Sequence, residues 1–150
     1  METTFDPERP DRERFDPEKH IRHLGAEPVI GLLDPRGRVL PGISGTAGVA
    51  ERIAAGAEIG IDRIMMKPGS AFALHTHPGA HILYVLRARG IIHVDGTDYA
   101  MAEGDTVYVP AHYAHGVRTL GDSRTPLEFL AFGVPHMPLD SSRRMSFVEP

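Results

Sequence analysis

From residue 28 onward, short apolar runs alternate with residues that form turns. The runs include "VIGLL", "GIDRIMM", "HILYVL", "GIIHV", "DTVYV" and "LEFLAF", and glycine, proline and aspartate separate them. Turn signals recur at intervals of about 8–12 residues, a spacing typical of short strands joined by tight connections. The pattern therefore predicts an all-β chain folded as a sandwich or a barrel.

Two segments of this region stand out. Asp95-Gly96 lies between "GIIHV" and "TDY", and this dipeptide is a strong signal for a two-residue hairpin. Residues 49–60, "VAERIAAGAEIG", fit a helix or a strand equally well.

The first 24 residues are rich in charge and poor in apolar side chains, and "FDPE" occurs twice, at Phe5–Glu8 and Phe15–Glu18. Aspartate followed by proline and glutamate favours a helix start. The second copy predicts a short helix ending at Gly25. We expect residues 1–24 to form a mobile arm, or an arm that docks on a neighbouring subunit through Phe5 and Phe15. Residues 25–140 should form the barrel, and residues 141–150 a tail with no clear structure.

Composition narrows the class of protein. A chain of 150 residues with 41% hydrophobic and 24% charged residues fits one globular domain. The net charge of −4, without a basic stripe, argues against a nucleic-acid partner. The sequence has no apolar run of about 18 residues and no signal peptide, so we expect no membrane contact and a cytoplasmic location. Cysteine is absent, so any metal must bind to His, Asp or Glu.

Six of the nine histidines lie between residues 75 and 115. In "HTHPGAH", His75 and His77 are two positions apart and therefore share one face of a strand. His81 has the same parity if the strand resumes after Pro78-Gly79. His115 follows "EGDTVYVP", on a strand that could return beside the first. Four imidazoles on one inner wall predict a site for a divalent transition metal.

These histidines lie in two motifs that resemble those of the cupin superfamily, across roughly residues 60–133. The first motif is "GSAFALHTHPGAHILYVLRARG", and the second is "GDTVYVPAHYAH". The resemblance implies a six-to-eight-stranded jelly-roll barrel with a metal inside. Three positions depart from the family pattern: His81 replaces an acidic ligand, His112 a glycine and Thr119 an asparagine. The ligand set implied is the four-histidine variant of cupins.

Four neutral ligands cancel none of the charge of a divalent cation, so the site should favour enolates, phenolates, carboxylates or hydroxide. Open coordination positions would permit Lewis-acid chemistry or activation of water, whereas a closed tetrahedral zinc shell would be structural. Zn²⁺ is the favoured metal, with Mn²⁺, Fe²⁺, Ni²⁺ and Cu²⁺ as alternatives.

Other side chains are weaker candidates. Phe72, Leu83 and Phe129 are expected to line an apolar pocket above the metal. Arg63 could hold an anionic oxygen if its strand parity points it inward; otherwise it is an exposed arginine. His112 is either a proton shuttle at the barrel mouth or a solvent-facing turn residue. His93 and His136 are expected on the surface.

Within the superfamily, a short stand-alone chain with four histidines and a charged N-terminal region is similar to the cupin polyketide cyclases of bacterial aromatic polyketide pathways, such as the resistomycin pathway. That resemblance implies aldol cyclisation and aromatisation of a poly-β-keto intermediate, possible presentation of this substrate with other pathway enzymes, and a homodimer. Two alternatives stay open: a dioxygenase that cleaves a C–C bond in a diketone or phenol, and a non-catalytic cupin that binds a metal or small molecule.

Overall fold

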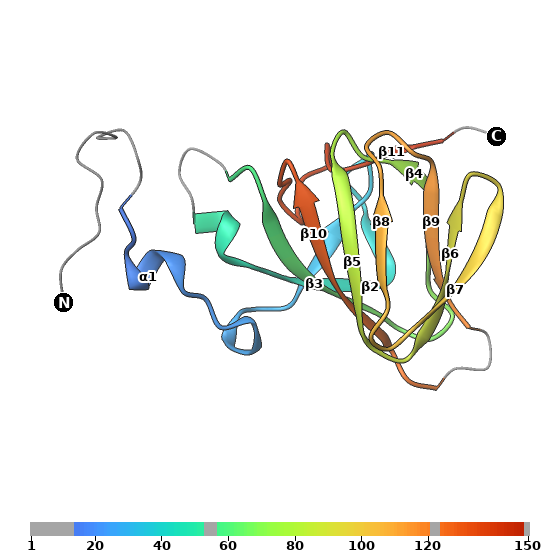
Figure 1. The fold of residues 1–150 in the computed structure, drawn as a ribbon, viewed down its shortest axis with the longest axis horizontal. Helices are drawn as coiled ribbons and strands as arrows, with labels where there is room; N and C mark the ends of the chain where they lie inside the picture. The colour runs from blue at the N-terminus through green and yellow to red at the C-terminus, as the bar shows by residue number, and fades with distance from the viewer. Residues whose placement is uncertain (1–13, 53–56, 121–123, 149–150) are drawn as a thin grey trace.

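The computed structural model describes residues 14–52, 57–120 and 124–148. Strands dominate it, as Figure 1 shows. The elements in chain order are α1 (Pro17–His20), η1 (Leu24–Ala26), β1 (Ile30–Leu33), β2 (Val39–Ala47), η2 (Val49–Arg52), β3 (Gly60–Met66), β4 (Ala71–Thr76), β5 (Ala80–Arg87), β6 (Arg89–Val94), β7 (Thr97–Ala102), β8 (Thr106–Val109), β9 (His115–Thr119), β10 (Leu127–Val134) and β11 (Ser146–Phe147).

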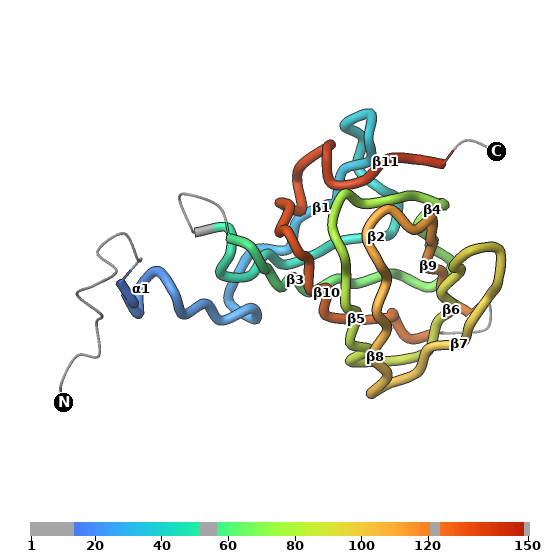
Figure 2. The backbone as a smooth tube through the Cα atoms, turned by 45° about the horizontal axis from the view of Figure 1, so that its top comes forward, coloured from blue at the N-terminus to red at the C-terminus, as the bar shows by residue number. Residues whose placement is uncertain are grey.

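The strands form two antiparallel sheets that face each other across one core. One sheet has the order β1-β2-β3-β10-β5-β8, and the other has the order β11-β4-β9-β6-β7. Figure 2 shows how the two sheets curve around a common interior. This arrangement confirms the all-β fold expected from the strand pattern and the jelly-roll that the cupin resemblance implies. The described residues hold more strands than the six to eight expected, in part because the short strands β1 and β11 each add an edge to a sheet.

The predicted hairpin joins β6 to β7. Val94 pairs with Thr97, and Asp95 and Gly96 between them have φ angles of 50° and 80°. Positive φ at both central residues is the requirement of the turn whose twist matches that of the strands. The dipeptide therefore fixes the register of this edge of the second sheet.

Strand β3 settles which face of "GIDRIMM" points inward. Its burial alternates residue by residue, with Asp62, Ile64 and Met66 buried. Ile64 and Met66 pack into a core that also includes Val85 and Leu127, and each such side chain stabilises the fold by about 1.5–3 kcal/mol. Arg63 consequently lies on the outer face of the sheet.

The N-terminal region differs in detail from the expectation. Asp16 caps α1 by accepting from the Glu18 N–H, and proline occupies the first turn, as "FDPE" predicts. The helix ends at His20 rather than at Gly25, because Ile21 adopts an extended conformation, and the separate 3₁₀ turn η1 follows it. Phe15 is 71% exposed and stacks on His20. The first copy of "FDPE", including Phe5, lies outside the described residues.

Two further segments are resolved by the structure. The ambiguous stretch 49–60 begins as the 3₁₀ turn η2 and ends at the start of β3. The C-terminal region, for which the sequence indicated no structure, contains β11, which pairs with β4 through Ser146–Thr76 and Phe147–His75. No helix in the described part of the chain is long and apolar enough to cross a membrane.

Candidate metal centre

Three strands bring the histidines of the two motifs together. His75 lies near the end of β4, His81 at the second position of β5 and His115 at the start of β9, where it pairs directly with His75. His77 follows immediately after β4. The side chains of His75, His77 and His115 are buried, with residue exposures of 3%, 6% and 5%.

A bulge in β4 aims His75 into the barrel. The pairing of β4 with β9 shifts register between Phe72 and His75, and both intervening residues are exposed. Phe72 and His75 are consequently both buried although they are three positions apart. A bulge re-aims a side chain in this way, so strand parity alone does not place Phe72 beside His75.

The turn between His77 and His81 depends on Gly79. A Cβ atom at this position would collide with the carbonyl oxygen of Val134 on β10, so only glycine lets the turn approach that strand. The strand β5 then resumes with the parity expected from the sequence, and His81 shares the inner face with Leu83 and Val85.

Backbone carbonyls orient three of the imidazoles. The Nδ1–H groups of His75, His77 and His115 donate to the carbonyl oxygens of Ala73 (2.6 Å), Arg144 (2.7 Å) and Tyr113 (2.8 Å). A carbonyl only accepts, so these bonds place the proton on Nδ1 and leave the Nε2 lone pair free. This is how metal-binding histidines are commonly held.

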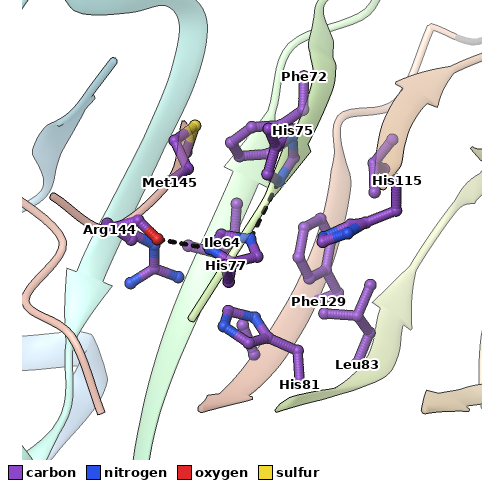
Figure 3. A pocket seen from close by; sticks show the side chains of 12 residues that line it. Ile64, Phe72, His75, His77, His81, Leu83, His115, Phe129, Arg144 and Met145 are labelled. Carbon is purple, nitrogen blue, oxygen red and sulfur yellow. Dashed lines mark hydrogen bonds between the residues drawn. The ribbon is translucent and has the colours of Figure 1, made fainter. Parts of the chain in front are cut away.

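The donor atoms of these three histidines lie within 4.8 Å of one another. The Nε2 atoms of His75 and His77 are 3.0 Å apart (Figure 3). Two lone pairs at this distance repel each other unless a cation or a shared proton lies near both. The residues therefore fit a divalent metal, and they would bind it through imidazole nitrogens.

His81 lies at the side of this cluster. Its ring stacks on that of His77 with centroids 4.0 Å apart, whereas the centroid of His115 is 6.5 Å away. All four histidines line the same cavity. Among the described residues, however, only His75, His77 and His115 form the compact cluster of donor atoms at this site.

All four imidazoles are held in their neutral form. Burial lowers the pKa of His77 to about 2, and electrostatic repulsion from His81 is the next cause. Burial lowers the pKa of His81 to about 3, and the charge of Arg144 is the next cause. Burial also lowers the pKa of His115. Burial, followed by electrostatic repulsion from His115 and His77, lowers the pKa of His75 well below its ordinary value. Neutral imidazoles are the form that binds a metal.

The cavity around the histidines has mostly apolar walls. Phe72, Leu83 and Phe129, the three pocket residues expected from the sequence, all line it. Figure 3 shows these side chains around the imidazoles. A wall of this kind leaves little water around the donor nitrogens.

Among the wall residues that sequence reasoning did not predict, Arg144 and Met145 carry the most information about the site. They come from the C-terminal segment, which β11 ties to β4. Arg144 is 6% exposed, and its Nη1 lies 3.3 Å from Oδ2 of Asp62. The one available signal was Asp62 itself, since a carboxylate among inward apolar residues needs a buried cation nearby.

The other candidates lie outside the cavity wall. Arg63 forms an ion pair with Glu128 at 2.6 Å on the outer face of the sheet. His112 is exposed on its turn with a φ of 63°, and its backbone N–H donates to the carbonyl oxygen of His77. His93 is partly exposed and bonds to Asp98 at 2.8 Å.

His136 corrects an expectation, because its side chain is 6% exposed rather than on the surface. Its Nε2 lies 3.2 Å from Glu51, and its Nδ1 lies 4.0 Å from Asp62. These three residues form a second cluster of potential metal ligands. The Arg144 guanidinium already supplies a cation beside Asp62, so we interpret the cluster as a charge network.

Comparison with known proteins agrees with this architecture. A model of the cupin domain matches residues 62–133, which include both histidine motifs. The chain is 36% identical over 70 residues to the oxalate-binding protein of Thermotoga maritima, a stretch that covers 46% of this chain and 56% of the relative. The chain thus spans only about half the length of the curated relatives it matches.

Solved structures share the fold. A predicted oxalate decarboxylase from Thermotoga maritima has a TM-score of 0.54 and 25% identity, covering 63% of this chain and 81% of that one. The polyketide cyclase RemF from Streptomyces resistomycificus has a TM-score of 0.65 and 16% identity, covering 79% of this chain and 80% of that one. Residues 62–133 thus match a cupin domain, and the two facing sheets that carry both histidine motifs have the cupin fold.

Proposed function

We propose that this cupin is a metal-dependent polyketide cyclase, which closes a ring in a poly-β-keto intermediate by aldol condensation. One observation carries the proposal: none of the 12 residues that line the cavity is acidic, whereas four are neutral histidines and one is a buried arginine. Such a site attracts anionic oxygens, and the enolate of a β-diketone has that charge.

The residues divide the work in a simple way. His75, His77 and His115 would hold the metal through Nε2, and His81 would complete the set. A bound divalent metal would act as a Lewis acid on carbonyl and enolate oxygens. Phe72, Leu83 and Phe129 would fold the chain of the substrate and exclude water from the reacting carbons.

The reaction balances without a further reactant. A carbon next to two carbonyl groups loses a proton, and it forms a C–C bond to a ketone carbon of the same chain. The ketone oxygen takes up a proton and leaves as water, and enolisation of the remaining ring carbonyl groups gives the aromatic ring. A test incubates the Zn²⁺-loaded protein with a synthetic poly-β-ketone and detects the dehydrated cyclic product by mass spectrometry.

His115→Asn is the matched variant for this test, and His93→Asn is its control, because His93 lies outside the cavity wall. We expect His115→Asn to lose metal and cyclisation together and His93→Asn to keep both. Full activity of His115→Asn after chelation would contradict the proposal. Stoichiometric oxygen uptake with C–C cleavage would instead indicate a dioxygenase.

A second candidate function is non-catalytic binding of a small carboxylate. It is supported by the 36% identity to an oxalate-binding protein and by the buried arginine in the wall. Tight binding of oxalate to the metal-loaded protein, with no turnover of any poly-β-ketone, would favour this candidate. A homodimer remains a prediction for either function, and sedimentation would test it.

A further inference from the structure

Arg144 is the one permanent charge in the described wall of the cavity, and its position is fixed from behind. Its Nη1 donates to Oδ2 of Asp62 at 3.3 Å and to the carbonyl oxygen of Met137 at 3.1 Å. Asp62 is itself held on β3 and accepts from the Gly48 N–H at 3.2 Å. These contacts use both protons of Nη1.

The other edge of the guanidinium has no hydrogen-bond partner among the residues that the structure describes. Within residues 14–52, 57–120 and 124–148, Arg144 donates side-chain hydrogen bonds from Nη1, and none from Nε or Nη2. Neither atom is fully buried, since the fully buried side-chain nitrogens without a partner in the described residues are Nε of Arg22 and Nε of Arg63. The Nε and Nη2 edge therefore keeps contact with the cavity that Arg144 lines.

This edge lies next to the imidazole cluster. The Arg144 carbonyl oxygen accepts from Nδ1 of His77, so one residue both orients a histidine and places the guanidinium. In Figure 3 the side chain lies beside His77 and His81, on the side away from His115. The charge of Arg144 contributes to the lowered pKa values of His75, His77 and His81, which agrees with this proximity.

We propose that Arg144 anchors a carboxylate of the substrate, so that the ligand of this cavity is a β-keto carboxylate. The Nε and Nη2 protons form the planar fork that matches two carboxylate oxygens. The carbonyl groups of the same molecule would then face the imidazole nitrogens. This inference rests on the proposed function and restricts its substrate to a free acid, since a neutral thioester offers the fork no charge.

The test is calorimetric titration of the Zn²⁺-loaded full chain with two probes. The probe 3-oxoglutarate is a β-keto carboxylate, and acetylacetone is a β-diketone that lacks a carboxylate. Arg144→Lys keeps the charge but removes the fork. We expect this variant to bind 3-oxoglutarate about tenfold more weakly or worse, and acetylacetone within about threefold of the unchanged protein.

Two further variants make the result decisive. The double variant Arg144→Gln with Asp62→Asn removes both charges and therefore leaves no unpaired carboxylate buried. It tests the anchor even if Arg144→Lys fails to fold. Arg63→Lys is the control, because it makes the same change on the outer face of β3. The double variant should lose 3-oxoglutarate affinity as Arg144→Lys does, and Arg63→Lys should bind both probes normally.

Unchanged affinity for 3-oxoglutarate, or an equal loss for both probes, would overturn the carboxylate anchor. The metal content and melting temperature of each variant separate a lost anchor from a lost fold. The proposed cyclase function fails in a different way, if the unchanged protein does not bind acetylacetone at all. Arg144-dependent binding of 3-oxoglutarate would still support the anchor in that case.

Discussion

Each histidine of the compact cluster is oriented by a backbone carbonyl rather than by a carboxylate. His75 and His115 use carbonyl groups two residues earlier in their own segments. His77 uses a carbonyl group 67 residues away in the chain. A neutral acceptor fixes the tautomer without adding negative charge, so the donor set stays neutral throughout and leaves the full charge of a bound cation to its ligands.

These neutral histidines make the metal-free protein sensitive to acid. The folded pKa values of His77 and His81, about 2 and about 3, lie below the ordinary value of 6.5. As the pH falls below 6.5, the unfolded chain binds protons that the folded chain does not. The free energy of unfolding should therefore fall by up to about 1.4 kcal/mol per pH unit for each histidine.

Thermal unfolding of the chelator-treated protein between about pH 7 and about pH 4 measures this loss. We expect His81→Asn to show a shallower decline, because one of the four imidazoles with a lowered pKa is absent. A melting temperature that stays constant over this range would show that the imidazoles do not remain neutral in the folded state.

The residues of the site were predictable to different extents for a physical reason. Spacing and strand parity placed His75, His77, His81 and His115 on one wall. They did not place Arg144, because its role depends on a contact with Asp62 that spans 82 residues. Arg63 was ambiguous, since both faces of "GIDRIMM" carry two apolar residues and one charged residue, and only the packed sheet distinguishes them.

At the scale of elements, the C-terminal segment completes the site. The strand β11 adds an edge beside His75, and Arg144 and Met145 before it form part of the cavity wall. The strand β11 is two residues long, which is too short to show an alternating pattern in the sequence. Such a strand forms because the rest of the sheet is already in place, which is why sequence periodicity gave no sign of it.

Deleting residues 143–150 should weaken metal binding while the two sheets still form. The deletion removes the carbonyl group that orients His77, and the loss of such an orienting partner weakens metal affinity by about 10–100-fold. Competition titration with a chromophoric chelator measures the change, and circular dichroism checks the strand content. Phe15→Ala, at an exposed position near α1, serves as a control. Unchanged metal affinity in the shortened chain would show that the carbonyl does not orient the ligand.

At the scale of the whole molecule, the candidate metal centre lies between the two sheets. His75 and His115 lie on the sheet that contains β4 and β9, whereas His81 lies on β5 of the other sheet. A bound metal would therefore link both halves of the core. Turn chemistry and run length predicted these sheets well, because most of the strands are bounded by glycine, proline or aspartate in the sequence.

Metal binding should consequently stabilise the entire fold. A free Zn²⁺ concentration about 100 times the Kd adds about 2.7 kcal/mol to the free energy of unfolding. For a chain of 150 residues, this corresponds to a rise of about 5–10 °C in Tm. Differential scanning calorimetry with and without Zn²⁺ measures the shift, and His115→Asn should abolish it. An equal rise in the Tm of that variant would mean that the metal binds at a different site.

The long-range bond from His77 to the Arg144 carbonyl has a consequence for how the protein is made. A ribosome delivers both histidine motifs well before residue 144 leaves the exit tunnel. Until then, the Nδ1 proton of His77 lacks its acceptor, and the cavity lacks both its arginine and Met145. The nascent barrel thus carries the imidazoles but not the completed site. If the site binds a metal, full affinity would be reached only after residue 144 is delivered, so a product terminated before it would fold with a weaker metal site.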